Sequence, residues 1–185
     1  MESSLRVGVD LEPPPLSAFL KETTSRLTDM LISSILSGDL PATHSLLFSS
    51  SSSLSSTSGP ILVNNPDSKG WSPIHHCVAV RIPSTQILDA LYSAGADVSL
   101  FTTDEKQTPL HILARSFQSA DISHSLATFI LHLILDLRAP LSARDKDDET
   151  CIHIAAEHGI SLGLLMLLLQ CDASGTVRKM KNSRG

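Results

Sequence analysis

The chain has 185 residues, a hydrophobic fraction of 42% and a formal net charge of −5 at pH 7. This apolar content suffices for a packed core and is too high for a fully disordered chain. The acidic balance argues against nucleic acid as the direct partner. The longest apolar runs fall short of the roughly 20 residues that span a bilayer, so we expect no membrane insertion.

The N-terminal quarter is predicted to be helical after an extended start. Residues 1–15 end in three prolines, which cannot occupy a helix interior, and should form an extended lead-in. Apolar residues then recur at helical spacing. Gly38 is expected to end this helix, and Asp39 to cap a second helix that reaches Phe48. We interpret residues 16–48 as a degenerate N-terminal helical repeat.

A serine-rich segment follows at residues 49–60. Such a composition buries almost no apolar surface, so the segment is predicted to be a disordered loop. Serine tracts can accept phosphate, but they are also common in plain linkers, and an inert loop is the favoured interpretation.

Three later segments are near-copies of one another. Each consists of a hydroxyl residue, then Pro or Cys, an aliphatic residue and His. The copies are Ser72-Pro73-Ile74-His75, Thr108-Pro109-Leu110-His111 and Thr150-Cys151-Ile152-His153. The first and second hydroxyl residues are 36 positions apart, and the second and third are 42 apart. Self-similarity at such a period is typical of solenoid proteins.

These copies resemble the ankyrin repeat, which has a period of about 33 residues and the signature T-P-L-H-x-A. The closest stretches are residues 108–114 and 150–159, and residues 91–98 match the end of a unit. The resemblance implies an all-α solenoid of stacked helix-turn-helix units with hairpin-like loops. It places three repeats at about 67–102, 103–144 and 145–181, with insertions near 81–85 and 117–124.

The residue types in the copies support this resemblance independently. A hydroxyl group can cap a helix start, proline is tolerated at the first helical position, and glycine suits the turn after a helix. The residues assigned to the structural motif are Ser72, Pro73, His75, Thr108, Pro109, His111, Thr150, His153 and Gly159.

The repeated histidines are interpreted as structural. A catalytic base or metal ligand would rarely be copied in every unit, and in the ankyrin family this histidine ties neighbouring loops together. His76 and Cys77 are adjacent and lack the ligand spacing of a zinc site. The chain has no nucleophile motif and no glycine-rich phosphate loop. We therefore expect no catalytic residues, no metal and no cofactor, and the protein is predicted not to be an enzyme.

The three cysteines point to a reducing environment. Their number is odd, they are widely spaced, and the N-terminus lacks a signal-peptide pattern. A disulfide scaffold is therefore not expected. We expect a cytoplasmic or nuclear location instead. Cys77, Cys151 and Cys171 are predicted to be small buried residues.

The family resemblance also implies how a partner would bind. Ankyrin proteins bind other proteins through the concave face and the hairpin tips, using variable residues beside the motif. The matching positions are Ser68, Lys69, Trp71, Ala79, Val80, Asp104, Glu105, Gln107, Arg115, Ser116, Lys146, Asp147, Glu149, Glu157 and His158. Trp71 is the leading candidate, because family geometry would expose it and tryptophan is enriched at binding hot spots. The alternative is that Trp71 packs against the neighbouring Ser-rich loop or a proline.

The acidic run at residues 145–149 lacks the ligand pattern of a calcium loop. We expect it at an exposed hairpin tip. Its favoured role is solubility, and the alternative role is attraction of a basic partner.

Residues 182–185 parallel residues 67–70, which suggests the start of a truncated further repeat. The chain is thus expected to be a fragment of a larger protein. The apolar segment Leu162–Leu169 should then be partly uncovered or covered by another chain, and self-association through this end is an option.

Three functions are considered. The favoured one is a protein-interaction or scaffold domain. The alternatives are the ankyrin regulatory region of a transcription factor, and a targeting or inhibitory module of an enzyme whose catalytic domain lies elsewhere.

Overall fold

A computed structural model describes residues 16–48, 62–117, 119, 121–158 and 161–185. Every regular element in these ranges is a helix and none is a strand, which confirms the all-α prediction. The predictions for residues 1–15, for the serine-rich segment 49–60 and for Gly159 lie outside the described residues.

The described helices follow one another in pairs. In chain order they are α1 (Leu16–Ser37) and α2 (Leu40–Phe48), α4 (Pro73–Ala79) and α5 (Thr85–Ser93), α6 (Pro109–Ser116) and α7 (His124–Leu131), and α8 (Cys151–His158) and α9 (Leu162–Cys171). A π-helical segment, η1 (His132–Asp136), continues α7, and a short 3-10 turn, η2 (Val177–Lys179), follows α9.

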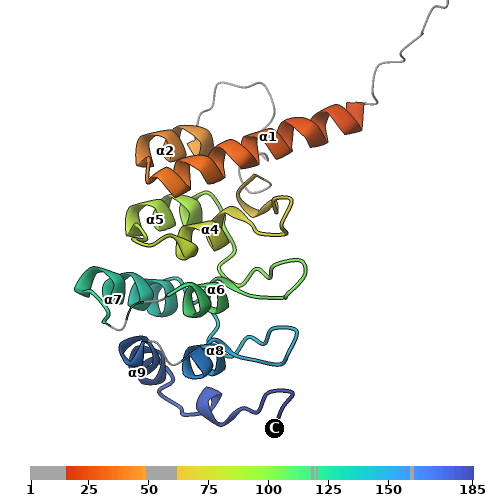
Figure 1. Cartoon of the computed structure of the whole chain (residues 1–185). Coiled ribbons are helices and arrows are strands. Elements are labelled where there is room, and N and C mark those ends of the chain that lie inside the picture. The colour runs from red at the N-terminus through yellow and green to blue at the C-terminus, as the bar shows by residue number, and fades with distance from the viewer. Residues whose placement is uncertain (1–15, 49–61, 118, 120, 159–160) are drawn as a thin grey trace, which may run out of the picture.

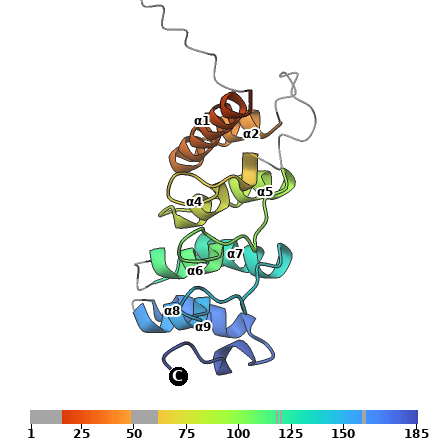
Figure 2. The same cartoon turned by 90° about the vertical axis from the view of Figure 1, so that its right-hand side faces the viewer.

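These pairs stack along a single axis (Figures 1 and 2). Helices α1, α4, α6 and α8 contact one another in succession and form an inner column. Helices α2, α5, α7 and α9 form an outer column, in which α2 contacts α5 and α7 contacts α9. The loops before α4, α6 and α8 project in a row on the inner side (Figure 1).

The first pair begins and ends as the sequence predicts. Gly38 follows α1 with a positive φ of 72°, a conformation that favours glycine. Asp39 then caps α2, because its Oδ1 accepts a hydrogen bond from the backbone N–H of Ala42 at 2.9 Å.

Serine side chains start three of the outer helices. The hydroxyl oxygens of Ser84, Ser123 and Ser161 accept hydrogen bonds from the backbone N–H groups three residues later, at 3.4, 3.3 and 3.2 Å. A serine cap satisfies a backbone donor that has no partner inside the helix.

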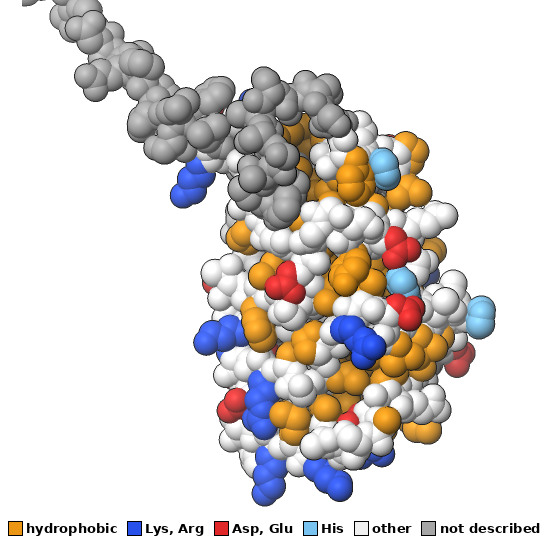
Figure 3. All heavy atoms as spheres, turned by 180° about the vertical axis from the view of Figure 1, so that it is seen from behind, with side chains coloured by type: hydrophobic (Ala, Val, Ile, Leu, Met, Phe, Trp, Pro, Cys, Tyr) orange, Lys and Arg blue, Asp and Glu red, His pale blue; other side chains and the backbone are white. Residues whose placement is uncertain are grey.

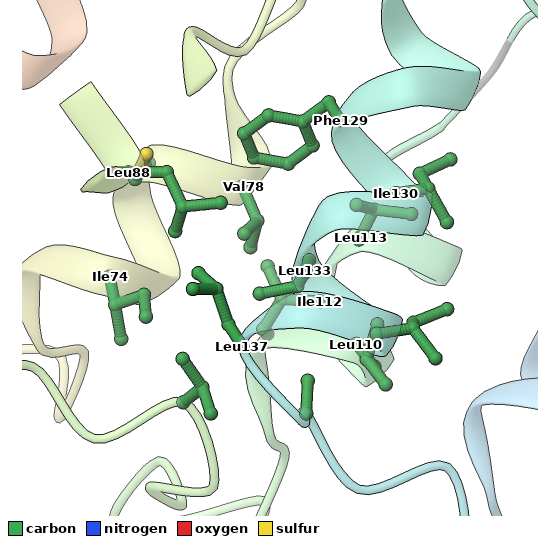
Figure 4. Close-up of a cluster of buried hydrophobic side chains, with 14 of the residues drawn as sticks. Ile74, Val78, Leu88, Leu110, Ile112, Leu113, Phe129, Ile130, Leu133 and Leu137 are labelled. Carbon is green, nitrogen blue, oxygen red and sulfur yellow. The ribbon is translucent and has the colours of Figure 1, made fainter. Parts of the chain in front are cut away.

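One cluster of buried hydrophobic side chains includes residues of all the pairs. Figure 4 shows part of this cluster, where α4 and α5 meet α6, α7 and η1. Ile74 of α4, Leu110 of α6 and Phe129 of α7 are each at most 1% exposed. Burying such a side chain contributes about 1.5–3 kcal/mol. Since each pair buries its apolar face against its neighbours, the stack is stabilised along its length.

The longest apolar run lies in this core. Phe129, Ile130 and Leu133 of the run at residues 126–137 are buried, whereas Leu135 is 54% exposed. No helix in the described ranges has the length and apolar character needed to cross a membrane.

The last helix is only partly covered. Leu164 and Leu168 are buried, whereas Leu162 is 69% and Met166 is 50% exposed. This agrees with the prediction that the segment Leu162–Leu169 is partly uncovered.

Candidate functional site

The repeated histidines link each inner helix to the loop that follows in the stack. In the first copy, Nδ1 of His75 accepts a hydrogen bond from the backbone N–H of Ser72 at 3.2 Å and from the Ser72 hydroxyl at 2.8 Å. Nδ1 is an acceptor in both bonds, so the proton of the neutral ring is on Nε2. Nε2–H then donates to the backbone carbonyls of Leu100 and Gln107 at 3.1 and 3.2 Å.

The other two copies repeat this arrangement. The hydroxyl of Thr108 bonds Nδ1 of His111 at 2.7 Å, and the equivalent Nδ1 of His153 accepts the backbone N–H of Thr150 at 3.1 Å. Nε2–H of His111 donates to the carbonyl of Glu149, and the corresponding group of His153 donates to the next loop, both at 2.9 Å. The prediction that these histidines tie neighbouring loops together is confirmed.

Burial keeps the rings of His75 and His111 neutral. Loss of hydration lowers the pKa of His75 to about 4 and also lowers the pKa of His111. Both nitrogens of each ring are occupied by backbone and hydroxyl partners, so neither ring can act as a general base or metal ligand in this conformation. No cluster of His, Cys, Asp and Glu in the described part of the chain could hold a metal ion.

The cysteine thiols are also expected to be unreactive. Cys77 and Cys151 are buried, as predicted, and burial raises the pKa of each thiol to about 12. Cys171 is half-buried. A thiol with a raised pKa is a poor nucleophile, because the thiolate is the reactive form.

The loops before α4, α6 and α8 are closed in a similar way. Each is closed by a 2.9 Å backbone hydrogen bond, from Asp67 to Trp71, from Thr102 to Gln107 and from Asp145 to Glu149. The position two residues before each motif hydroxyl has a positive φ, and it is occupied by Gly70 (76°), Lys106 (51°) and Asp148 (58°). The three loops thus share a positive φ at this position, although two of them have a residue other than glycine there.

Backbone hydrogen bonds join the loop tips to one another. The N–H of Thr103 donates to the carbonyl of Gly70, and the N–H of Lys146 donates to the carbonyl of Glu105, both at 3.1 Å. The side chains of Lys146 and Glu105 also form a salt bridge of 2.5 Å. These contacts hold the tips in a fixed row.

Most predicted partner-binding residues lie on the surface. Those that are exposed are Ser68, Lys69, Asp104, Glu105, Arg115, Ser116, Lys146, Asp147, Glu157 and His158, while Ala79 and Val80 are half-buried. Gln107 and Glu149 are only 4% and 5% exposed, so placing them on a contact surface is wrong. They immediately precede the motif hydroxyl, where the chain turns inward to start a helix.

The expectation that Trp71 is exposed is also wrong. Its ring is half-buried and packs against the hydrophobic core. The ring centroid lies 5.3 Å from that of His76 and 6.4 Å from that of His75. Trp71 therefore contributes to packing at the start of α4, through His75, His76 and the core.

The acidic run at residues 145–149 is not uniformly exposed. Asp145 is 6% exposed, and its Oδ1 accepts the backbone N–H groups of Asp147 and Glu149, each at 2.9 Å. The buried carboxylate of Glu149 accepts hydrogen bonds from Arg184 and Asn182. The carboxylates of Asp145 and Glu149 thus turn inward, because loop N–H groups and C-terminal residues donate hydrogen bonds to them. The prediction of an exposed acidic tip holds only for the residues between these two.

One charged cluster was not predicted. Nε2 of His132 lies 2.6 Å from the carboxylate of Asp89 in α5, and Nδ1 lies 2.7 Å from the carboxylate of Asp136. These two hydrogen bonds raise the pKa of His132. The four-residue spacing of His132 and Asp136 was a usable signal. Asp89 is 43 residues away in sequence, and only the fold brings it to the ring.

Fold and site together define an all-helical protein of stacked helix pairs joined by repeated histidine links. No family model matches the chain. The chain is 36% identical over 98 residues to alpha-latrotoxin-Lg1a of Latrodectus geometricus, an alignment that covers 52% of this chain and 6% of the toxin. It is 30% identical over 154 residues to inversin of Canis lupus familiaris, covering 83% of this chain and 12% of inversin. The chain thus matches only a small part of the length of each relative.

Proposed function

We propose that this chain is a non-catalytic protein-interaction module of the ankyrin-repeat type, acting as a scaffold. Three sets of observations support this. The motif copies carry the same hydroxyl–histidine link to the next loop, the helix pairs stack along one axis, and most of the chain aligns with part of inversin. Similar units that bury their faces against neighbours build extended surfaces suited to macromolecular partners.

The observation that carries the proposal is the row of loop tips. Lys69, Asp104 and Asp147 are exposed at the tips of successive loops, and backbone hydrogen bonds fix the loops relative to one another. Because the tips are held in place before binding, a partner would lose little free energy to ordering them.

The inner helices extend this surface. Arg115 and Ser116 at the end of α6, and Glu157 and His158 at the end of α8, are exposed. Charged and polar side chains of both signs then line the tips and the inner face, an arrangement that favours selectivity for one partner over others.

Charge reversal at the tips tests the proposal. Wild-type protein and the double variant Asp104→Lys/Asp147→Lys would each be used to isolate bound proteins from cells of the source organism. Both carboxylates are exposed, so the variant should fold normally while its specific partners are depleted at least tenfold. The matched control is Asp29→Lys, which reverses an exposed charge on α1.

Equal recovery of every bound protein with the double variant and with Asp29→Lys would contradict a partner-binding role for the tips. Thermal unfolding of all three proteins, followed by circular dichroism, separates loss of binding from loss of folding.

A further inference from the structure

A groove runs between two helices of the outer column, away from the loop tips. It has a volume of about 680 Å³ and lies between α2 and α5. Its lining includes Leu40, Pro41, His44 and Phe48 from α2, and Asp89 and Ala90 from α5. Phe48 is 40% exposed, and its ring packs 4.5 Å from that of His44.

The spacing of the lining residues gives the groove its direction. Leu40, His44 and Phe48 follow one another at intervals of four along α2, so they form one stripe parallel to the helix axis. At 1.5 Å per residue this stripe is about 12 Å long, which matches two turns of a helix laid beside it. Recognition of an amphipathic helix by an apolar groove follows this pattern.

The Asp, Glu, Lys and Arg residues within the outer helices are all acidic. Helices α2, α5, α7 and α9 and the segment η1 contain no Lys or Arg, and their acidic residues are Asp89 and Asp136. Asp89 lines the groove and also a second depression of about 360 Å³ between α5 and the α7–η1 segment. The face that carries the outer column shows hydrophobic side chains interrupted by acidic, histidine and Lys or Arg side chains (Figure 3).

A single histidine does not neutralise the carboxylates of Asp89 and Asp136. His132 lies between Asp89 and Asp136, and even when it is protonated the three groups together keep a net negative charge. The side chains of Asp89 and Asp136 are 54% and 68% exposed, so an incoming cation can reach them. Arg138, the nearest basic residue in sequence, follows η1 in the next loop.

We propose that the α2–α5 groove binds a short amphipathic helix of another protein, with apolar side chains in the groove and a Lys or Arg at Asp89 and Asp136. Leu40 and Phe48 supply the apolar area that is buried, and the carboxylates of Asp89 and Asp136 favour a positive charge on the bound peptide. This surface lies on the outer column, so it adds a second interaction site to the proposed row of loop tips.

The test begins with a randomised 12-residue peptide library, displayed on phage and selected against the intact 185-residue chain. We expect the selected peptides to share apolar residues at helical spacing and at least one Lys or Arg. The tightest peptide would be synthesised with a fluorescent label, and its affinity measured by fluorescence anisotropy.

Two pairs of variants locate the bound peptide. Gln86→Trp fills the groove from an exposed position of α5, and Gln170→Trp places the same side chain on exposed α9. Asp89→Lys reverses the charge beside the groove, and Asp29→Lys reverses a charge on α1. The first variant of each pair should weaken binding at least tenfold and the second less than twofold.

Three results would overturn the proposal: a selection without binders, binders without Lys or Arg, and a peptide that binds the two groove variants as tightly as their controls. The variant Asp104→Lys/Asp147→Lys separates this surface from the loop tips. It should leave the peptide affinity unchanged, whereas the proposed function predicts that it removes the partner of the tips.

Discussion

The Nε2–H group of His111 donates a 2.9 Å hydrogen bond to the carbonyl of Glu149, which lies 38 residues further along the chain. The same carbonyl accepts the bond that closes its own loop, from the N–H of Asp145 at 2.9 Å. The carboxylate of Glu149 binds Arg184 from the next segment of the stack. Glu149 therefore links three successive units, and His111 is its hydrogen-bond partner from the preceding unit.

Replacing His111 should destabilise the protein. His111 is fully buried, so His111→Ala leaves a cavity, an unpaired carbonyl lone pair and an unpaired Thr108 hydroxyl. We expect the free energy of unfolding to fall by about 3 kcal/mol, measured by urea denaturation. His124→Ala, at an exposed position of α7, is the control and should cost less than about 0.5 kcal/mol. Equal effects of the two changes would show that the link is not stabilising.

Two glycines with positive φ separate backbone strain from steric contact. At Gly70 an added Cβ would lie 2.7 Å from the Cβ of Thr103, whereas at Gly38 nothing lies within 4 Å. Gly38→Ala should cost about 1 kcal/mol from backbone strain alone. Gly70→Ala should cost about 2–3 kcal/mol, because the two loops must also move apart. Thermal unfolding of the two variants measures the difference, and a smaller loss for Gly70→Ala would contradict the contact.

Acid should weaken the stack through His75. The pKa of His75 is lowered to about 4 in the folded protein, while the unfolded chain has the ordinary value of 6.5. Between these values the unfolded state binds more protons, so stability is lost as the pH falls from 6.5 towards 4. The loss is on the order of 3 kcal/mol for this residue. NMR titration checks the cause: the His75 ring should stay neutral at pH 5.5, and a midpoint near 6.5 would contradict it.

His132 should respond with the opposite sign. Hydrogen bonds to Asp136 and Asp89 raise its pKa above 6.5 in the folded protein. Its contribution is complete below pH 6.5 and is lost as the pH rises through the raised value. The cluster is largely exposed, so we expect a loss on the order of 0.5 kcal/mol that salt reduces further. The difference in unfolding free energy between wild type and His132→Gln, measured from pH 6 to 9, should shrink, and a constant difference would contradict the ion pairs.

Replacing Arg184 tests the contact between Glu149 and the C-terminal residues. Arg184 pairs with Glu149 and, at 2.9 Å, with Glu157. Arg184→Ala removes one of the side-chain donors to the buried carboxylate of Glu149, so the protein should be destabilised and its urea midpoint should fall. Lys181→Ala, three residues earlier and exposed, should have little effect on the urea midpoint. Equal midpoints for the two variants would argue against the pairing.

Local patterns in the sequence were sufficient to predict several elements. Gly38 and Asp39 mark the end of α1 and the start of α2, because a positive φ and an N-cap depend on a few neighbouring residues. The histidine link was also predictable, since its hydroxyl partner lies three residues away in each copy. The serine caps of α5, α7 and α9 are equally local but were not predicted.

Exposure could not be predicted in the same way. Trp71, Gln107 and Glu149 occupy positions that vary in a repeat family and that a sequence pattern places at the surface. Whether such a side chain faces solvent depends on what packs around it: Trp71 packs against His76 of α4 and the hydrophobic core, and Glu149 contacts residues near the C-terminus. These contacts join residues from different elements and involve no periodic pattern.

By itself the sequence determined the helical class, the repeated motif and the partners within each motif, because helix capping and hydrophobic periodicity act over a few residues. The tertiary structure alone decided which polar side chains are buried and which charges meet. The cluster of Asp89, His132 and Asp136 forms because stacking brings α5 beside the α7–η1 segment. The distance between those helices depends on how the side chains of the whole core pack, and no local stretch of sequence contains that information.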